Sequence, residues 1–311
     1  MHTDMTSTAR IIPFASAALQ ARNASRKALA TEAANSTVLE DALLRVAESD
    51  SRDREQEENR LLVLLLDALA EQRFEVHFQP QHCLETGTTL GAEALLRLAD
   101  EQGRYLNTQA LIDVAEAHHL MELIGRQIMD QACAGFVQLK RAGFVSGRLA
   151  LNVSMLELRH PGYCEALLSS IAAHGLQPED VELEITESQP LDLPGVHLEQ
   201  LIELDASGVH LAIDDFGTGF ATWNSLARLP IRSVKLDRSA ITPVLHCART
   251  AALIKHMAQC GEAMQFRVVA EGVQSTAQRE RLVALGCTVG QGFGLSVPAS
   301  VEDLLGADQA S

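Results

Sequence analysis

The chain has 311 residues, a formal net charge of −16 and six cysteines. Its hydrophobic fraction of 47% is typical of a globular protein and excludes a disordered or collagen-like chain. The 41 acidic residues outnumber the 25 Lys and Arg residues, which argues against a protein that coats DNA or an anionic membrane, because such binding needs cations. The cysteines stand singly, which predicts reduced thiols and a cytoplasmic location. No apolar run approaches the roughly 18 residues of a membrane-spanning helix, so we expect no membrane insertion.

Residues 1–60 are expected to form a tail and a helical, charged N-terminal segment that is partly disordered. The stretch from Glu48 to Arg60 is a charge run without an apolar period, as in a solvated helix or a linker. The apolar run Leu61–Leu66 follows and begins the main body. Because this run must be buried, it either packs against the chain's own main body, or it drives oligomerisation or docks a protein regulator.

From Phe74 onward, short β-favouring runs alternate with longer helical ones, which indicates parallel strands joined by helices. The predicted strands are Phe74–Gln79, Leu90–Leu95, Arg148–Val153, Val181–Ile185, Val209–Ile213, Ser233–Leu236, Arg267–Ala270 and Thr288–Gln291. The predicted helices between them include Thr108–Leu139, Cys164–His174, Gly195–Ser207, Ala240–Glu262 and Thr276–Leu285. Eight strands in about 230 residues favour an α/β fold of the (β/α)₈ TIM-like barrel type. The alternative, an open doubly wound sheet, would usually carry a Gly-rich turn after its first strand, and Gln79–His82 is not one.

Polar residues stand at or just after every predicted strand, and five of them are acidic: Gln79, Glu93, Asn152, Glu184, Asp214, Asp215, Lys235, Glu271 and Gln291. Since strand ends in a barrel open into one cup, we expect these side chains to meet. Crowded carboxylates repel one another unless cations compensate them, and oxygen ligands without clustered His or Cys suit Mg²⁺ or Mn²⁺. The Asp214-Asp215 pair could serve two ions about 3.5–4 Å apart, as in phosphodiester hydrolysis. An Asp-rich turn explains that dipeptide alone equally well.

The run Glu93-Ala94-Leu95, followed by Leu96-Arg97, resembles the signature of the EAL domain family, bacterial phosphodiesterases for cyclic di-GMP. The agreement continues through Gln79-Pro80, Asn152-Val153-Ser154, Glu182–Ser188, Asp214–Phe220, Leu229-Pro230, Lys235–Ser239, Ala270–Val273 and Gln291–Phe293. The resemblance implies an EAL-type barrel with an antiparallel first strand. We expect this barrel to occupy residues 61–303, followed by a short tail at 304–311.

The resemblance also implies roles for individual side chains. One metal ion would be held by Glu93, Asn152, Glu184 and Asp214. Asp214 would bridge to a second ion, which Asp215 and, directly or through water, Glu271 would also hold. Lys235 would orient or activate the attacking water, with Glu271 as the general base. The residues implied in substrate binding are Gln79, Arg97, Asp237 and Gln291, and Gln291 would also help to order the second metal site. Glu187 would anchor the loop from Asp215 to Asn224.

The function implied is hydrolysis of cyclic di-GMP to linear 5′-pGpG with two Mg²⁺ or Mn²⁺ ions, by a homodimer. One alternative is a catalytically weak EAL domain that acts as a cyclic di-GMP receptor or a protein-interaction module. Another is a metal enzyme of different chemistry on the same barrel. The complete set of metal ligands favours the enzyme, because non-catalytic relatives usually lose one or more of them. The sequence Phe220-Ala221-Thr222-Trp223, which departs from the family pattern, keeps the receptor alternative open.

Overall fold

The computed structural model describes residues 54–158, 160, 162–186, 195–218 and 223–308. The chain divides into two units, residues 1–61 and residues 62–311. Residues 54–71 are helical. In the second unit this helix buries Leu65 and Ala68 fully, whereas the side chains of Val63 and Leu66 are exposed. The carbonyl of Leu69 accepts a hydrogen bond from Gln127 Nε2 on helix α3 (Met121–Arg141) at 3.2 Å. Part of the predicted apolar run is therefore buried within the second unit itself.

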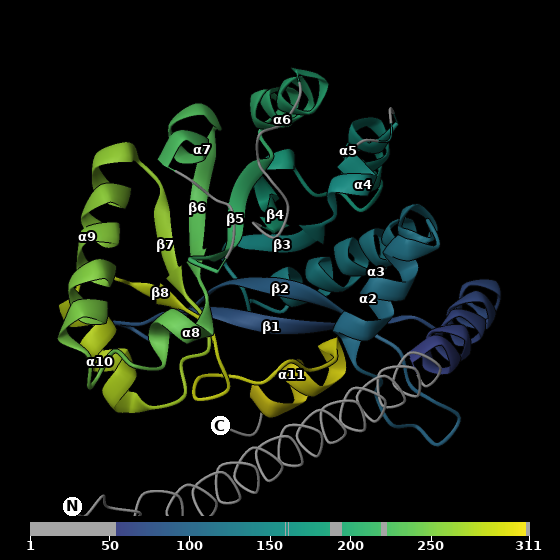
Figure 1. The fold of residues 1–311 in the computed structure, drawn as a ribbon, viewed down its shortest axis with the longest axis horizontal. Helices are drawn as coiled ribbons and strands as arrows, with labels where there is room; N and C mark the ends of the chain where they lie inside the picture. Colours follow the sequence, from purple (N-terminus) through teal and green to yellow (C-terminus); the bar gives the residue numbers. More distant parts are fainter. Residues whose placement is uncertain (1–53, 159, 161, 187–194, 219–222, 309–311) are drawn as a thin grey trace, which may run out of the picture. The chain divides into compact units, whose positions relative to one another are not determined.

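Among the described residues, eight strands close into a barrel in sequence order (Figure 1). They are β1 (Glu75–Cys83), β2 (Thr89–Arg97), β3 (Arg148–Val153), β4 (Val181–Thr186), β5 (His210–Phe216), β6 (Ile231–Leu236), β7 (Arg267–Ala270) and β8 (Val289–Gly290). β1 is antiparallel to both of its neighbours, and all other neighbouring pairs are parallel. The predicted TIM-like barrel with an antiparallel first strand is confirmed, and the open sheet is excluded.

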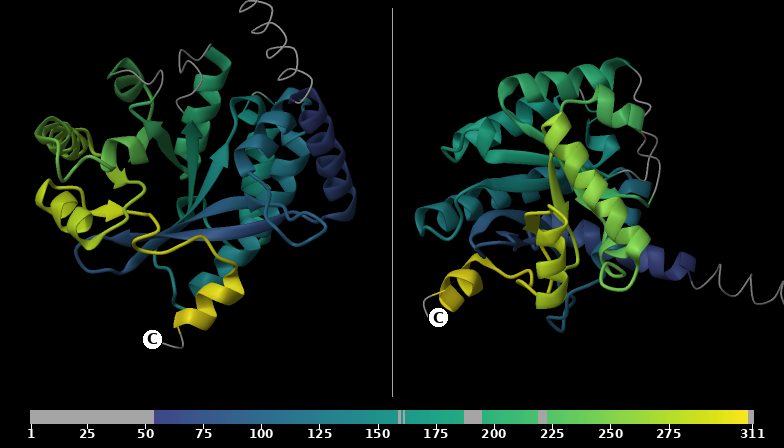
Figure 2. Two further views of the ribbon diagram at one scale, coloured as in Figure 1. Left: turned by 60° about the horizontal axis from the view of Figure 1, so that its bottom comes forward. Right: turned by 90° about the vertical axis from the view of Figure 1, so that its left-hand side faces the viewer.

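The helices surround the outside of this sheet (Figure 2). Besides α3 they are α2 (Thr108–Ala117), α4 (Met155–Leu158), α5 (Tyr163–Ala173), α6 (Gly195–Ser207), α7 (Trp223–Arg228), α8 (Arg238–Ile241), α9 (Ala248–Met264), α10 (Thr276–Ala284) and α11 (Val301–Asp308). A 3₁₀ turn, η1 (Pro178–Asp180), precedes β4. None of the helices within the described ranges is long and apolar enough to cross a membrane.

Two long helices predicted from the sequence are divided in the structure, so both predictions were wrong as single helices. The predicted Thr108–Leu139 helix is interrupted after α2, where His119 has a φ of 56°, a left-handed conformation that ends a helix. The predicted Ala240–Glu262 helix is divided into α8 and α9. Pro243 lies in this gap and has no backbone N–H to donate to a helical hydrogen bond.

Alternation along the strands separates an apolar layer from a polar interior. On β4, Leu183 and Ile185 are fully buried members of the hydrophobic core that lies between strands and helices. Their neighbours Glu182 and Glu184 are equally buried, but they face the barrel axis, because successive side chains of a strand point to opposite faces. The barrel interior therefore collects charged side chains, which positions the site described next.

Candidate active site

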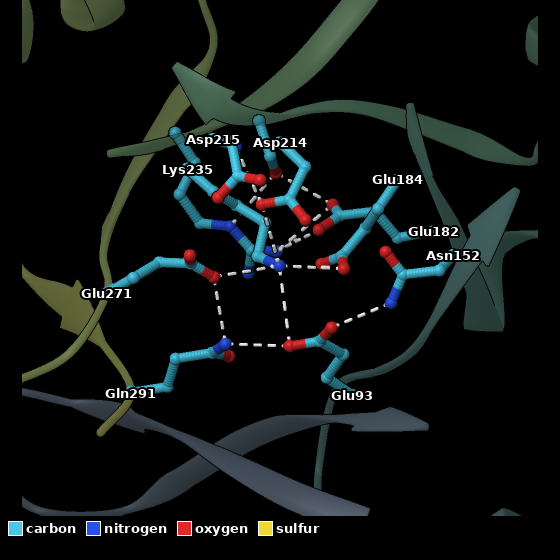
Figure 3. A network of polar contacts seen from close by, with 11 residues as sticks. Glu93, Asn152, Glu182, Glu184, Asp214, Asp215, Lys235, Glu271 and Gln291 are labelled. Carbon is cyan, nitrogen blue, oxygen red and sulfur yellow. Dashed lines mark hydrogen bonds and ion pairs between the residues drawn. The ribbon is translucent and has the colours of Figure 1, made fainter. Parts of the chain in front are cut away.

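The ammonium group of Lys235, on β6, lies among four carboxylates inside the barrel (Figure 3). Its Nζ atom is 2.7 Å from an oxygen of Glu184, 2.8 Å from Glu271, 3.1 Å from Asp214 and 3.4 Å from Glu93. The lysine side chain is 1% exposed. A buried ion is costly unless close partners compensate it, and here four acids, three on strands and Glu271 just after β7, share one cation.

Two amides tie these carboxylates together. Asn152 Nδ2, on β3, donates to Glu93 Oε1 at 2.7 Å. Gln291, which follows β8, donates through Nε2 to Glu93 Oε2 at 2.7 Å and to Glu271 Oε1 at 2.9 Å (Figure 3). The strands thus bring the nine polar residues expected in the cup towards a common region, with one difference from the expectation. Gln79 and Glu93 do not end their strands; they are paired in register in the middle of β1 and β2.

The crowding shifts the protonation equilibria of the cup. Burial disfavours the charged form of Lys235, yet Asp214, Glu184, Glu271 and Glu93 together raise its pKa well above the usual value. Burial raises the pKa of Glu184 well above its ordinary range, and the neighbouring Glu93 adds to this effect. Burial also raises the pKa of Glu271 to about 8. Burial opposes ionisation of Glu93 too, but Lys235 and the two amides lower its pKa overall.

The acidic groups fall into two overlapping sets suited to cations. Oxygens of Glu93, Glu184 and Asp214 lie within 4.8 Å of one another, and so do oxygens of Asp214, Asp215 and Glu271. Glu184 is fully buried, and its Oε1 atom has no hydrogen-bond partner. An unpartnered buried carboxylate oxygen is costly, so it is a ready ligand for a hard cation. The donor set therefore fits Mg²⁺ or Mn²⁺, with Asp214 common to both groups.

The other residues predicted to act in the site lie around this centre, with one exception. Asp215 is half-buried with a φ of 54°, and burial together with Asp214 raises its pKa to about 6. Asp237 caps α8 by accepting the N–H of Ser239 at 2.8 Å. Arg97 Nη1 donates to the carbonyl of Leu96 at 2.8 Å. Gln79 Nε2 donates to the carbonyl of Ser296 at 3.3 Å. Glu187 lies outside the described residues, as do positions 219–222 of the loop it was expected to anchor.

A second buried polar cluster, which sequence reasoning missed, involves Glu182, one inward position before Glu184. Glu182 is 1% exposed and accepts two hydrogen bonds from Arg267 Nη2, each 3.0 Å, and one from Ser233 Oγ at 2.7 Å. Each of its two oxygens thus has a partner, in contrast to Glu184. The inward spacing of two along β4 was the signal that could have revealed it.

The barrel and its cup define a class: an acid-lined α/β barrel whose inward carboxylates form two overlapping groups that could hold a metal ion. The EAL domain model matches residues 64–298, so the chain belongs to the EAL domain family. The predicted family is thereby confirmed.

Relatives and solved structures agree with this membership. The chain is 34% identical over 258 residues to the bifunctional diguanylate cyclase/cyclic di-GMP phosphodiesterase MucR of Pseudomonas aeruginosa, covering 83% of this chain and 38% of MucR. It is 31% identical over 232 residues to the cyclic di-GMP phosphodiesterase RocR of the same organism, covering 75% of this chain and 59% of RocR. The chain therefore spans less than two thirds of the length of either relative. A structure of the MucR phosphodiesterase in complex with c-di-GMP has a TM-score of 0.74 at 34% identity, and the match covers 79% of this chain and 99% of that one.

Proposed function

We propose that the protein hydrolyses cyclic di-GMP to linear 5′-pGpG in a reaction that requires two Mg²⁺ or Mn²⁺ ions. The names of MucR and RocR as cyclic di-GMP phosphodiesterases support the substrate and the reaction. The observation that carries the proposal is that two sets of three carboxylates, each able to hold a cation, share Asp214. Two cations held side by side suit the hydrolysis of a phosphodiester anion.

The first ion would be held by Glu93, Asn152, Glu184 and Asp214, and the second by Asp214, Asp215 and Glu271. Such ions neutralise the phosphodiester, lower the pKa of water and stabilise the leaving alkoxide. The unpartnered Glu184 Oε1 supports the first set.

The remaining groups act on water and substrate. The carboxylate of Glu271 would accept the proton of the attacking water. Lys235 Nζ, 2.8 Å from Glu271, would orient this carboxylate and the water. Gln79, Arg97, Asp237 and Gln291 would bind the substrate. The planar guanidinium of Arg97 suits a phosphate, because its N–H groups can donate two parallel hydrogen bonds.

The test is product analysis by chromatography after incubation of the purified protein with cyclic di-GMP and either metal. We expect 5′-pGpG in the presence of Mg²⁺ or Mn²⁺ and none in EDTA. The Glu93→Gln variant, which keeps the shape of the side chain and removes its charge, should lose at least about 100-fold in rate, as an essential group does. Glu85→Gln, a change to an exposed residue, is the matched control and should keep full activity.

Cyclic di-GMP that binds without being hydrolysed would contradict the enzyme proposal and support the receptor alternative. If the protein neither binds nor hydrolyses cyclic di-GMP, the alternative that stays is a protein-interaction module. The expected homodimer and a regulator of the N-terminal segment stay predictions, which light scattering of the full chain and of a variant lacking residues 1–58 would test.

A further inference from the structure

Beyond Gln291 the chain leaves the barrel wall and then rejoins it beside β1. Gly290 pairs with His82, and Ala299 exchanges two backbone hydrogen bonds with Phe78, at 2.8 and 3.1 Å. Between these points residues 292–296 form a tight turn, in which the N–H groups of Leu295 and Ser296 both donate to the carbonyl of Gly292 at 2.9 Å. We call residues 292–296 the wall loop. It follows directly after Gln291, which bonds Glu93 and Glu271.

The side chain of His82, on β1, forms a hydrogen bond with the wall loop. The pairing of β1 with β2 shifts register between Gln81 and His82, and such a bulge re-aims the side chain that follows it. The Nε2 atom of His82 lies 2.9 Å from Ser296 Oγ, and its Nδ1 atom lies 3.3 Å from the carbonyl oxygen of Gly87.

The hydrogen-bond partners determine the tautomer of His82. The carbonyl of Gly87 can only accept, so Nδ1 carries a proton. Burial and the nearby Arg279 lower the pKa of His82, although the Gly87 carbonyl opposes this, and the lowered pKa favours the neutral ring. In that form Nε2 can accept the hydroxyl proton of Ser296, for which the carbonyl oxygen of Leu295, 2.9 Å from the same Oγ atom, competes.

The same serine contacts the cup through its backbone. Its carbonyl oxygen accepts from Gln79 Nε2 at 3.3 Å. Gln79 is 8% exposed and is paired with Glu93 on the neighbouring strand. A side-chain amide can turn either its oxygen or its nitrogen towards a partner. Because a carbonyl oxygen only accepts hydrogen bonds, the amide nitrogen of Gln79 faces Ser296. The Ser296 carbonyl therefore fixes the orientation of the Gln79 amide.

We infer that His82 is a positioning residue: through Ser296 it holds the amide of Gln79 in the orientation that binds substrate. The inference rests on the proposed function, because that function assigns Gln79 to the substrate. Within the described residues, the hydrogen bonds of the His82 side chain go to Ser296 and to the turn at Gly87, at the end of β1 away from Arg97.

The test is a double-mutant cycle with steady-state kinetics on cyclic di-GMP. His82→Phe keeps a ring but removes both hydrogen bonds, and it should raise KM about fivefold with kcat changed less than twofold. In a Gln79→Ala background the same substitution should change KM less than twofold, because no amide is left to position. His256→Phe on α9, which removes an exposed histidine that lies 3.1 Å from Gln259, is the matched control and should change neither constant. An equal rise of KM in both backgrounds, or no rise with Gln79 present, would overturn the inference.

A second pair of variants covers the case in which His82→Phe does not fold. Ser296→Thr keeps the hydroxyl, and Ser296→Val has the shape of the threonine variant but lacks the hydroxyl. Only the valine variant should raise KM about fivefold, and equal KM values for the two variants would contradict the role of the hydroxyl. If the wild-type protein shows no turnover, calorimetric binding of cyclic di-GMP with Ca²⁺ replaces KM, with the same ratios expected among the variants. A wild-type protein that neither hydrolyses nor binds the dinucleotide would overturn both the proposed function and this role of His82.

Discussion

Glu157, on α4, is the carboxyl whose titration should most clearly change the stability of the protein. It is 6% exposed and caps its own helix: Oε2 accepts the N–H of Ser154 at 3.0 Å, and its N–H donates to Ser154 Oγ at 3.2 Å. Gly125, Met129 and Tyr163 line a small cavity around it. No ion pair compensates Glu157 within the described part of the chain, and burial raises its pKa from 4.5 to about 7.

The sign of the effect follows from the two pKa values. Below pH 4.5 the group is protonated in both the folded and the unfolded chain, so its burial carries no ionisation cost. Between pH 4.5 and about 7 the unfolded chain releases the proton and the folded chain keeps it, so the free energy of unfolding falls as the pH rises. At about 1.4 kcal/mol per pKa unit, the full loss is about 3.5 kcal/mol and is nearly complete about one pH unit above the folded-state pKa.

Glu157→Gln keeps an oxygen that can accept from Ser154 and removes the ionisation. Urea unfolding followed by circular dichroism at pH 5 and pH 8 should therefore show the variant gaining about 2.5 kcal/mol on the wild type between the two pH values. Carboxylates that titrate alike in both proteins cancel from this difference. The matched control is Glu165→Gln on α5, an exposed residue, and the free-energy difference between this variant and the wild type should be the same at pH 5 and pH 8. A difference for Glu157→Gln that does not change with pH would refute the reasoning.

Two further predictions concern the interior of the barrel and its packing. Lys235→Met should lower the free energy of unfolding in EDTA by about 3 kcal/mol, because four buried carboxylates lose their cation, and Mg²⁺ should restore part of the loss in thermal melts. Failure of EDTA-treated Lys235→Met to melt below the wild type would contradict this. Gly147→Ala should cost more than about 2 kcal/mol by thermal or urea unfolding, because the added carbon would overlap the backbone carbonyl of Leu90. Gly306→Ala on α11, where the space is open, should be neutral or stabilise by up to about 1 kcal/mol, and equal effects of the two glycine substitutions would contradict the packing argument.

The barrel could be predicted because its strands are short apolar runs that alternate with helices. The strands Arg148–Val153 and Arg267–Ala270 match the prediction to the residue. Helix ends were less predictable, because the interruption at His119 depends on a left-handed backbone conformation that apolar spacing does not reveal. The direction of β1 also could not be read from periodicity. It came from the family resemblance alone, since an antiparallel and a parallel strand have the same alternation.

The membership of the cup was predictable, whereas its arrangement was not. Residue spacing brought Glu93, Glu184 and Asp214 to one region, because inward positions of neighbouring strands converge on the barrel axis. The same spacing placed Lys235 in the cup, but it could not show that the ammonium lies within 3.4 Å of four carboxylates, nor that Glu184 keeps one oxygen without a partner. These features depend on side-chain orientation across strands far apart in the chain. His82 was missed for the same reason, because its partner Ser296 is 214 residues away.

The ammonium of Lys235 gives the barrel a counter-ion of its own, covalently attached and present from the moment of synthesis. A newly made chain can therefore close its strands around the four acids before any divalent ion arrives. If the proposed function holds, folding and metal loading would be separate events, unlike in small domains that fold only around their metal. If the proposed function holds, the amount of folded protein in a cell would be set by expression, and the supply of divalent ions would determine how much of it is active.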